Sequence, residues 1–171
     1  SSKGDHAKAV EDYTQAIRLK PDDYTLYESR ALAYSLAGDR VKTIEDYTHV
    51  IRLRPDDFRA YLDRGSAYAR KALDSGAAID TDKAIEDYTQ AIRLNPDYKF
   101  SYLERARAYE AKGEYDKAIS DFSQAIRLKP DDWLAYSSRG DAYKAKGESE
   151  KAAADFLKVR ELGGPGAGFR L

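Results

Sequence analysis

Hydrophobic and small residues recur along this chain at helical spacing, in segments separated by short polar breaks. In residues 24–55, Tyr27, Ala31 and Tyr34 follow one another at intervals of four and three, which places them on one face of a helix. The second half of this stretch carries a second stripe of that kind: Val41, Ile44, Tyr47, Val50 and Ile51. The pattern therefore predicts two helices in succession.

The breaks around these helices have the residues that start and end helices. Asp22 and Asp23 stand where an N-cap is needed, and Gly38 stands where a helix can end in a left-handed residue. Pro55 prevents the second helix from continuing. We expect two antiparallel helices, helix A and helix B, joined by a short turn. One such hairpin cannot bury its apolar face alone, so copies have to stack.

Copies are present. The motif DYTQAIRLKPDD begins at Asp12, and near-copies begin at Asp46, Asp87, Asp121 and, in decayed form, Asp155, so that the intervals are 34, 41, 34 and 34 residues. Such a period is typical of helical repeat arrays. The seven extra residues fall between the two helices of the third copy, within RKALDSGAAIDTDKA. We expect about one added turn in helix A, with three residues in the loop or at the start of helix B.

Counted from Tyr24 as position 1, the unit resembles the tetratricopeptide repeat. Aromatic residues stand at position 4 (Tyr27, Tyr61, Tyr102, Tyr136), position 11 (Tyr34, Tyr68, Tyr109, Tyr143) and position 24 (Tyr13, Tyr47, Tyr88, Phe122, Phe156). Position 8 is small (Ala31, Gly65, Ala106, Gly140), and position 32 is proline (Pro21, Pro55, Pro96, Pro130). The resemblance implies an all-α, right-handed α-solenoid of antiparallel helix hairpins, with about nine helices.

We expect one array over residues 1–162. Its parts are the second helix of repeat 1 at 5–19, repeat 2 at 24–55, repeat 3 at 58–96 with the insertion around 71–80, repeat 4 at 99–130, and repeat 5 at 133–162. A flexible glycine-rich tail is expected at 163–171, because glycine at this density disfavours a helix. No capping helix is evident after repeat 5.

Composition narrows the possible partners. The 29 Lys and Arg residues against 30 Asp and Glu leave a formal charge of −1, which argues against a nucleic acid or membrane surface as partner. The chain has no Cys, which excludes thiolate chemistry but not any compartment. Neither a signal peptide nor an apolar run long enough to span a membrane is evident. A cytoplasmic and a periplasmic location both stay open.

Residues suited to catalysis are scarce. His6 and His49 lie at different repeat positions, and no nucleophile elbow or glycine-rich phosphate loop occurs. Asp74, Asp80 and Asp82 do not have the spacing of a calcium loop, and a capping role for Asp80 or Thr81 is favoured. We expect no enzyme activity, no cofactor and no metal site.

Two other patterns each have two interpretations. The tyrosines at positions 4, 11 and 24 suit a buried core better than a base-stacking platform. Arginine recurs at position 7 (Arg30, Arg64, Arg105, Arg139) and aspartate at position 23 (Asp12, Asp46, Asp87, Asp121, Asp155). A ladder of Arg–Asp pairs is favoured over a row of anion-binding arginines, and Arg105 is expected to pair with Asp87 or Asp121.

The resemblance also implies a concave, peptide-binding groove lined by the A helices. Positions 2, 5, 9 and 12 share one helical stripe. The candidate peptide-binding residues on it are Glu28, Leu32, Arg59, Leu62, Ser66, Phe100, Leu103, Arg107, Leu134, Asp141 and Lys144. The apolar members suit a segment with apolar anchors, and Arg59 and Arg107 could bind a carboxylate. The alternative is that these side chains only cover helix packing.

The leading hypothesis is a protein-interaction module, a scaffold or adaptor that binds a peptide or partner protein in this groove. One alternative is a structural scaffold that self-assembles through exposed array ends, either by the helix at 5–19 or by a neighbour's tail entering the groove near Phe100 and Arg107. Another is a regulatory fragment of a larger protein.

Overall fold

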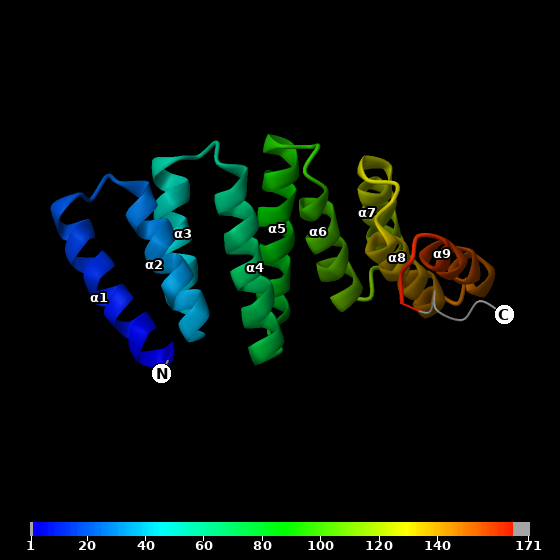
Figure 1. Ribbon diagram of the computed structural model, residues 1–171, viewed down its shortest axis with the longest axis horizontal. Helices are drawn as coiled ribbons and strands as arrows, with labels where there is room; N and C mark the ends of the chain where they lie inside the picture. The colour runs from blue at the N-terminus through cyan, green and yellow to red at the C-terminus, as the bar shows by residue number, and fades with distance from the viewer. Residues whose placement is uncertain (1, 166–171) are drawn as a thin grey trace. The chain divides into compact units, whose positions relative to one another are not determined.

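The computed structural model describes residues 2–165, with side chains from His6 to Pro165. Within that range it contains nine α-helices and no strand (Figure 1). The helices are α1 (Ser2–Leu19), α2 (Tyr24–Ala37), α3 (Arg40–Leu53), α4 (Phe58–Ser75), α5 (Ala78–Leu94), α6 (Lys99–Ala111), α7 (Tyr115–Leu128), α8 (Trp133–Lys146) and α9 (Ser149–Glu161). The all-α prediction is confirmed.

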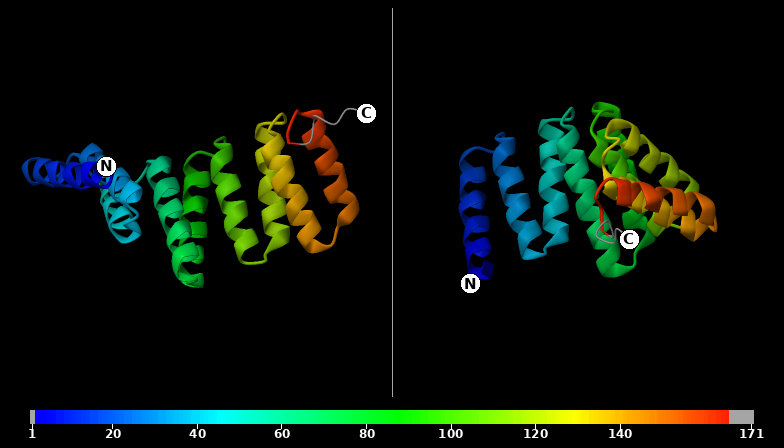
Figure 2. Two further views of the ribbon diagram at one scale, coloured as in Figure 1. Left: turned by 60° about the horizontal axis from the view of Figure 1, so that its bottom comes forward. Right: turned by 45° about the vertical axis from the view of Figure 1, so that its right-hand side comes forward.

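The chain forms two compact units, Ser1–Leu94 and Asn95–Leu171. In the first unit each helix from α1 to α5 packs against the next, and in the second unit α6 to α9 do the same (Figures 1 and 2). Four A–B hairpins result: α2–α3, α4–α5, α6–α7 and α8–α9. The helix α1 is a B helix whose A helix does not occur in the described part of the chain.

Of the two predicted N-cap candidates of α2, Asp23 caps the helix, and Asp57 and Asp132 cap α4 and α8 in the same way, whereas the cap expected at Asp80 or Thr81 is not formed because α5 begins earlier, at Ala78. The carboxylates of Asp23, Asp57 and Asp132 accept hydrogen bonds from backbone N–H groups two residues ahead, at 3.1, 3.0 and 3.2 Å. Gly38 ends α2 with φ of 85° and its N–H bonds back to Ser35, so this position needs a residue that tolerates the left-handed region.

The long third repeat is a lengthened hairpin. Helix α4 has 18 residues against 14 in α2, and α5 has 17 against 14 in α3, so the two helices absorb all seven extra residues. Only Gly76 and Ala77 separate α4 from α5, as Gly38 and Asp39 separate α2 from α3. The three residues whose place was left open therefore extend the start of helix B.

Some of the aromatic residues at positions 4 and 24 are buried in the core, and the others are partly buried. Tyr88 and Phe122 are fully buried, and Tyr27 and Tyr102 nearly so. Position 11 differs from the prediction, because its tyrosines are only partly buried. Each has a lysine from helix B over its ring, at 5.1 to 5.4 Å from Lys42, Lys83, Lys117 and Lys151. These rings close the edge of the hairpin and stabilise it partly through cation–π contacts.

Every complete repeat contains the same two-pronged ion pair, here called the arginine fork. The position-7 arginine donates from Nε and Nη2 to the two carboxylate oxygens of the position-23 aspartate, over 2.7 to 2.8 Å. The pairs are Arg30–Asp46, Arg64–Asp87, Arg105–Asp121 and Arg139–Asp155. The ladder is confirmed, and it joins helix A to helix B of the same repeat.

The fork also extends to the preceding repeat. Arg30 donates from Nη1 to the Thr14 hydroxyl at 3.0 Å, and Arg139 donates in the same way to Ser123 at 3.0 Å. Each hydroxyl in turn donates to the carbonyl four residues earlier in its own helix, at 2.7 Å. These guanidinium groups are thus engaged within the fold, and the anion-site interpretation loses its support.

The insertion contributes one ion pair of its own. The Asp80 carboxylate, only 2 % exposed, accepts from Lys71 Nζ at 2.8 and 3.0 Å. Lys71 belongs to the lengthened end of α4, and Asp80 belongs to the first turn of α5. The Asp80 side chain therefore joins the two extended helices.

We predict that Arg105→Ala lowers the free energy of unfolding by about 2–4 kcal/mol, because the nearly buried Asp121 carboxylate loses both prongs. A double-mutant cycle with Asp121→Asn should give a coupling of at least about 0.5 kcal/mol, measured by denaturant unfolding. Arg127→Ala, which removes an exposed cation from the same unit, is the control. Additive single effects would contradict the fork.

We predict that Lys71→Met destabilises by about 1–3 kcal/mol, because it leaves a buried carboxylate without its cation. Adding Asp80→Leu should restore most of the loss, since both charges are then removed. Thermal or chemical unfolding measures both effects, with the exposed Lys20→Met as the matched lysine control. A double variant as unstable as Lys71→Met would count against this account.

Candidate functional site

The predicted peptide-binding residues of the first unit lie on α2 and α4. Leu32 is 57 % exposed, and Leu62 and Ser66 are partly buried. The Ser66 hydroxyl is occupied, because it donates to the Leu62 carbonyl at 2.9 Å. Arg59 is exposed, with its guanidinium 5.6 Å from the Phe58 ring centre. Leu32 is thus the apolar side chain that this part of the stripe leaves most open.

Glu28, also on this stripe, is in an acidic setting. Partial burial raises the pKa of its carboxyl, and the Asp57 and Asp63 carboxylates raise it further, while Arg54 and Arg59 act in the opposite direction. A positive charge placed near Glu28 would stabilise the ionised form of its carboxyl.

In the second unit, the candidate anchors lie at the starts of α6 and α8. Phe100 is 46 % exposed and Leu134 is 41 % exposed. Lys99, next to Phe100, forms an ion pair with Asp132, the N-cap of α8 two residues before Leu134. This pair links the starts of α6 and α8, where the two exposed apolar side chains stand.

Leu103 lies on the same stripe but is only 3 % exposed. The stripe was assigned from helical spacing alone, and spacing does not reveal how deeply a side chain packs. Leu103 therefore packs beneath the surface and is not available for contact with a partner in this conformation.

Further along α6 and α8, some charged side chains are paired with an opposite charge and others face a like charge. Arg107 pairs with Glu104 of its own helix at 2.7 Å. Glu110, one turn further, has its carboxyl pKa raised by burial and then by the Asp141 carboxylate, while Arg107 only partly offsets this. Lys144 is exposed. Two carboxylates thus share this end of the stripe, which the sequence interpretation missed because it summed charges without pairing them.

A separate cavity of about 510 Å³ lies beside the last helix and is lined by Ser137, Ala153, Phe156, Leu157, Val159, Arg160 and Pro165. Near it the chain leaves α9 through Gly163, at φ of 79°, and turns back. Gly164 is buried, and a Cβ there would lie 2.5 Å from Val159 and 3.3 Å from Trp133. This turn takes the place of the Pro-Asp turn that follows the B helix of the other repeats. The expectations for residues 166–171 lie outside the described residues.

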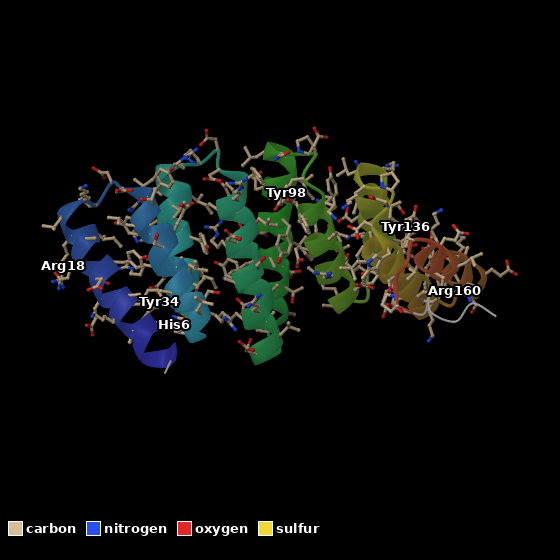
Figure 3. The ribbon with its side chains drawn as sticks, in the orientation of Figure 1. His6, Arg18, Tyr34, Tyr98, Tyr136 and Arg160 are labelled. Atoms are coloured by element: carbon tan, nitrogen blue, oxygen red, sulfur yellow. The ribbon has the colours of Figure 1, made fainter. Side chains whose placement is uncertain are left out.

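Over the described residues, no group of three or more His, Asp or Glu side chains could hold a metal ion. His49 stacks on Tyr27 with ring centres 5.0 Å apart and receives a hydrogen bond from Arg52. None of the described helices combines the length and apolarity needed to cross a membrane. Figure 3 shows the described side chains on the ribbon.

Comparison with known proteins agrees with this architecture. A family model described as TPR repeat matches residues 2–38 and 106–147, and two tetratricopeptide repeat models match residues 87–120 and 135–162. The chain is a tetratricopeptide-repeat protein. A search of curated protein sequences finds no significant match.

Solved structures of the same fold cover nearly the whole chain. A crystal structure of MamA is 28 % identical with a TM-score of 0.85, covering 94 % of this chain and 90 % of MamA. MamA 41-end from Desulfovibrio magneticus RS-1 is 21 % identical with a TM-score of 0.83, covering 94 % and 86 %. YrrB, described as a TPR protein with an unusual peptide-binding site, is 17 % identical with a TM-score of 0.77, covering 93 % and 78 %.

These comparisons establish the fold as an all-α tetratricopeptide-repeat solenoid. They also support the coarser functional prediction, because proteins of this family are generally interaction modules for proteins or peptides rather than enzymes.

Proposed function

We propose that this protein is an interaction module that binds a peptide segment across the A helices of its second unit, with an apolar residue at Phe100 and Leu134. The observation that carries the proposal is the exposure of these two side chains at the starts of α6 and α8, which the Lys99–Asp132 ion pair links. Neither is required for the hairpin core, which Tyr102, Phe122 and the arginine fork supply. Exposed aromatic and aliphatic groups at one place are the usual anchors of a peptide-binding surface.

The charges further along the stripe define the second part of the ligand. Glu110 and Asp141 repel each other, and Glu110 keeps a raised pKa. A lysine or arginine bound between them would relieve that repulsion, whereas a carboxylate would increase it. Arg107 is already balanced by Glu104. We therefore favour a segment that carries an apolar residue and, about one to two helical turns away, a basic residue.

The first unit repeats the same combination with other residues. Leu32 is exposed, and Glu28 has neighbouring carboxylates. This second surface would bind a segment that likewise carries apolar and basic residues. Such a role is that of a scaffold or adaptor, which holds a partner without changing it chemically.

We predict that peptides selected from a random 12-residue library against this protein contain an apolar and a basic residue. For a selected peptide, Phe100→Ala should weaken binding about tenfold, as expected for an anchor. Leu73→Ala is the matched control, because Leu73 is 81 % exposed and lies away from the stripe. Calorimetry measures the affinity, and circular dichroism shows that helicity is unchanged. Equal affinities for both variants would contradict the proposed surface.

The charge prediction concerns pH. The Glu110 pKa is raised above 4.5, and only the ionised carboxylate attracts a basic residue. The affinity for a basic peptide should therefore be highest at neutral pH, where Glu110 is ionised, and should fall as the pH is lowered through the Glu110 pKa. Glu110→Gln should weaken binding at neutral pH and flatten this dependence, while Glu150→Gln on α9 should do neither. A peptide that binds more tightly as Glu110 becomes protonated would refute the basic-residue assignment.

A further inference from the structure

The insertion in the third repeat gives the end of α4 an exposed face that carries opposite charges. Arg70 and Asp74 lie four residues apart on α4, with Leu73 between them. Spacings of three and four residues place these three side chains on one side of the helix. Arg70 is exposed, and among the described residues no hydrogen bond or ion pair occupies it. Leu73 and Asp74 are also mostly exposed. This face therefore offers a cation, an aliphatic side chain and a carboxylate to solvent.

The lengthened hairpin does not need this face for its own packing. Lys71 lies on another side of α4, where it donates to the buried Asp80 carboxylate of α5. That pair joins the two helices, whereas Arg70, Leu73 and Asp74 stay exposed. Figure 1 shows the end of α4 reaching lower than the end of α2, as its additional turn requires. The exposed face thus stands at the lengthened end of the hairpin.

The neighbouring hairpin adds exposed apolar side chains. Arg40, the first residue of α3, donates from Nη1 to the Ser35 carbonyl at 3.0 Å, and its Nε lies 3.5 Å from an Asp74 carboxylate oxygen. These contacts link the end of α2 and the start of α3 to the end of α4. Leu36, in the last turn of α2, and Val41, in the first turn of α3, are both exposed. Several exposed hydrophobic residues at linked helix ends favour an interaction surface.

The second unit lacks this feature. Around the turns between α6 and α7 and between α8 and α9, the described residues include no exposed large hydrophobic side chain. The apolar surface at the hairpin ends is therefore not a general property of the repeat. It accompanies the insertion and the hairpin that the insertion contacts through Arg40 and Asp74.

We propose that this face is a contact between two copies of the protein, in which the ends of the two α4 helices pack antiparallel. A two-fold axis that passes between Arg70 and Asp74 places each arginine against the aspartate of the partner subunit, so that both charges are paired at once. Leu73 lies between the two charges and packs against Leu73 of the partner subunit. Each subunit thus uses the same surface.

The order of the charges is the argument for a second copy as the partner. Along α4 the charges run from positive to negative, and an antiparallel copy presents a negative and then a positive charge opposite them. A helix of another protein meets this requirement only if it carries the same two charges at the same spacing. The formal charge of −1 adds little general repulsion between copies.

The size of the contact sets its strength. Each subunit contributes one helix end with a few side chains beside it, and interfaces that bury less than about 1,200 Å² in total are generally weak and transient. We therefore expect a dimer that forms as the concentration rises. The contact uses neither Phe100 nor Leu134, so a dimer would present the proposed peptide-binding surface twice, a consequence that rests on the proposed function.

Reversing the two charges separately tests the pairing. Arg70→Asp leaves two carboxylates on the face and Asp74→Arg leaves two arginines, so each variant opposes like charges in its own dimer. Sedimentation equilibrium at concentrations up to about 1 mM should show the unchanged protein approaching a dimer. Each variant alone should associate at least about fivefold more weakly. An equal mixture of the two variants should associate about as strongly as the unchanged protein, because every charge again faces its opposite.

Matched controls separate this face from other routes to association. Arg93→Asp makes the same change of net charge on an exposed arginine at the other end of α5 and should alter dimerisation less than about twofold. Leu73→Ser should weaken the dimer at least about fivefold, because the contact loses this side chain from both subunits. Leu19→Ser changes a leucine of matching exposure on α1 and should have little effect.

Circular dichroism checks that every variant is folded, as expected for changes at exposed positions. A protein that stays monomeric at all concentrations would overturn the proposal, and so would a mixture of Arg70→Asp and Asp74→Arg that does not associate. A dimer that Leu19→Ser or Arg93→Asp weakens as much as Leu73→Ser does would place the contact elsewhere and would equally contradict it.

Discussion

The arginine fork is the interaction on which the arrangement of each repeat depends. It places a carboxylate that is 2–6 % exposed inside a helix hairpin and satisfies both of its oxygens from one guanidinium. A buried carboxylate without such a partner is strongly destabilising. If helix A rotated or slid by one residue, the ion pair would break and the aspartate would be left buried without its partner. The fork therefore helps to fix the register of the two helices in each of the four complete repeats.

The third donor of the fork connects neighbouring repeats. Where Arg30 and Arg139 reach Thr14 and Ser123, a helix of one repeat contributes an acceptor to the next. Stability in such an array is the sum of hairpins and nearest-neighbour contacts, and this bond belongs to the second kind. At the position of these hydroxyls α9 has Leu157, which is 49 % exposed and lines the cavity near Pro165. That surface therefore lacks the acceptor through which the other repeats engage an arginine.

Much of this fold was predictable from the sequence, because it depends on local features that recur in each repeat. Helical spacing, Asp23 as N-cap, Gly38 as the left-handed end and the in-phase insertion follow from one helix at a time. Depth of burial does not. Leu103 shares a stripe with Phe100 yet is buried, and the position-11 tyrosines are only partly buried beneath lysines. Lys71 and Asp80 lie on different helices, and so do Glu110 and Asp141. Such pairs can be identified only once the helices are placed in the structure.

The balanced composition conceals an uneven use of charge. Most position-7 and position-23 charges neutralise each other inside the hairpins, and Arg107 is balanced by Glu104 on the surface. On the stripe of the second unit, Glu110 and Asp141 lie close enough for the Asp141 carboxylate to raise the Glu110 pKa, so this end of the stripe keeps an acidic character. A formal charge of −1 is thus compatible with a local preference for a basic group. Specificity in this protein therefore depends on which charged residues are already paired inside the hairpins, because a partner can interact only with the charged residues that stay accessible.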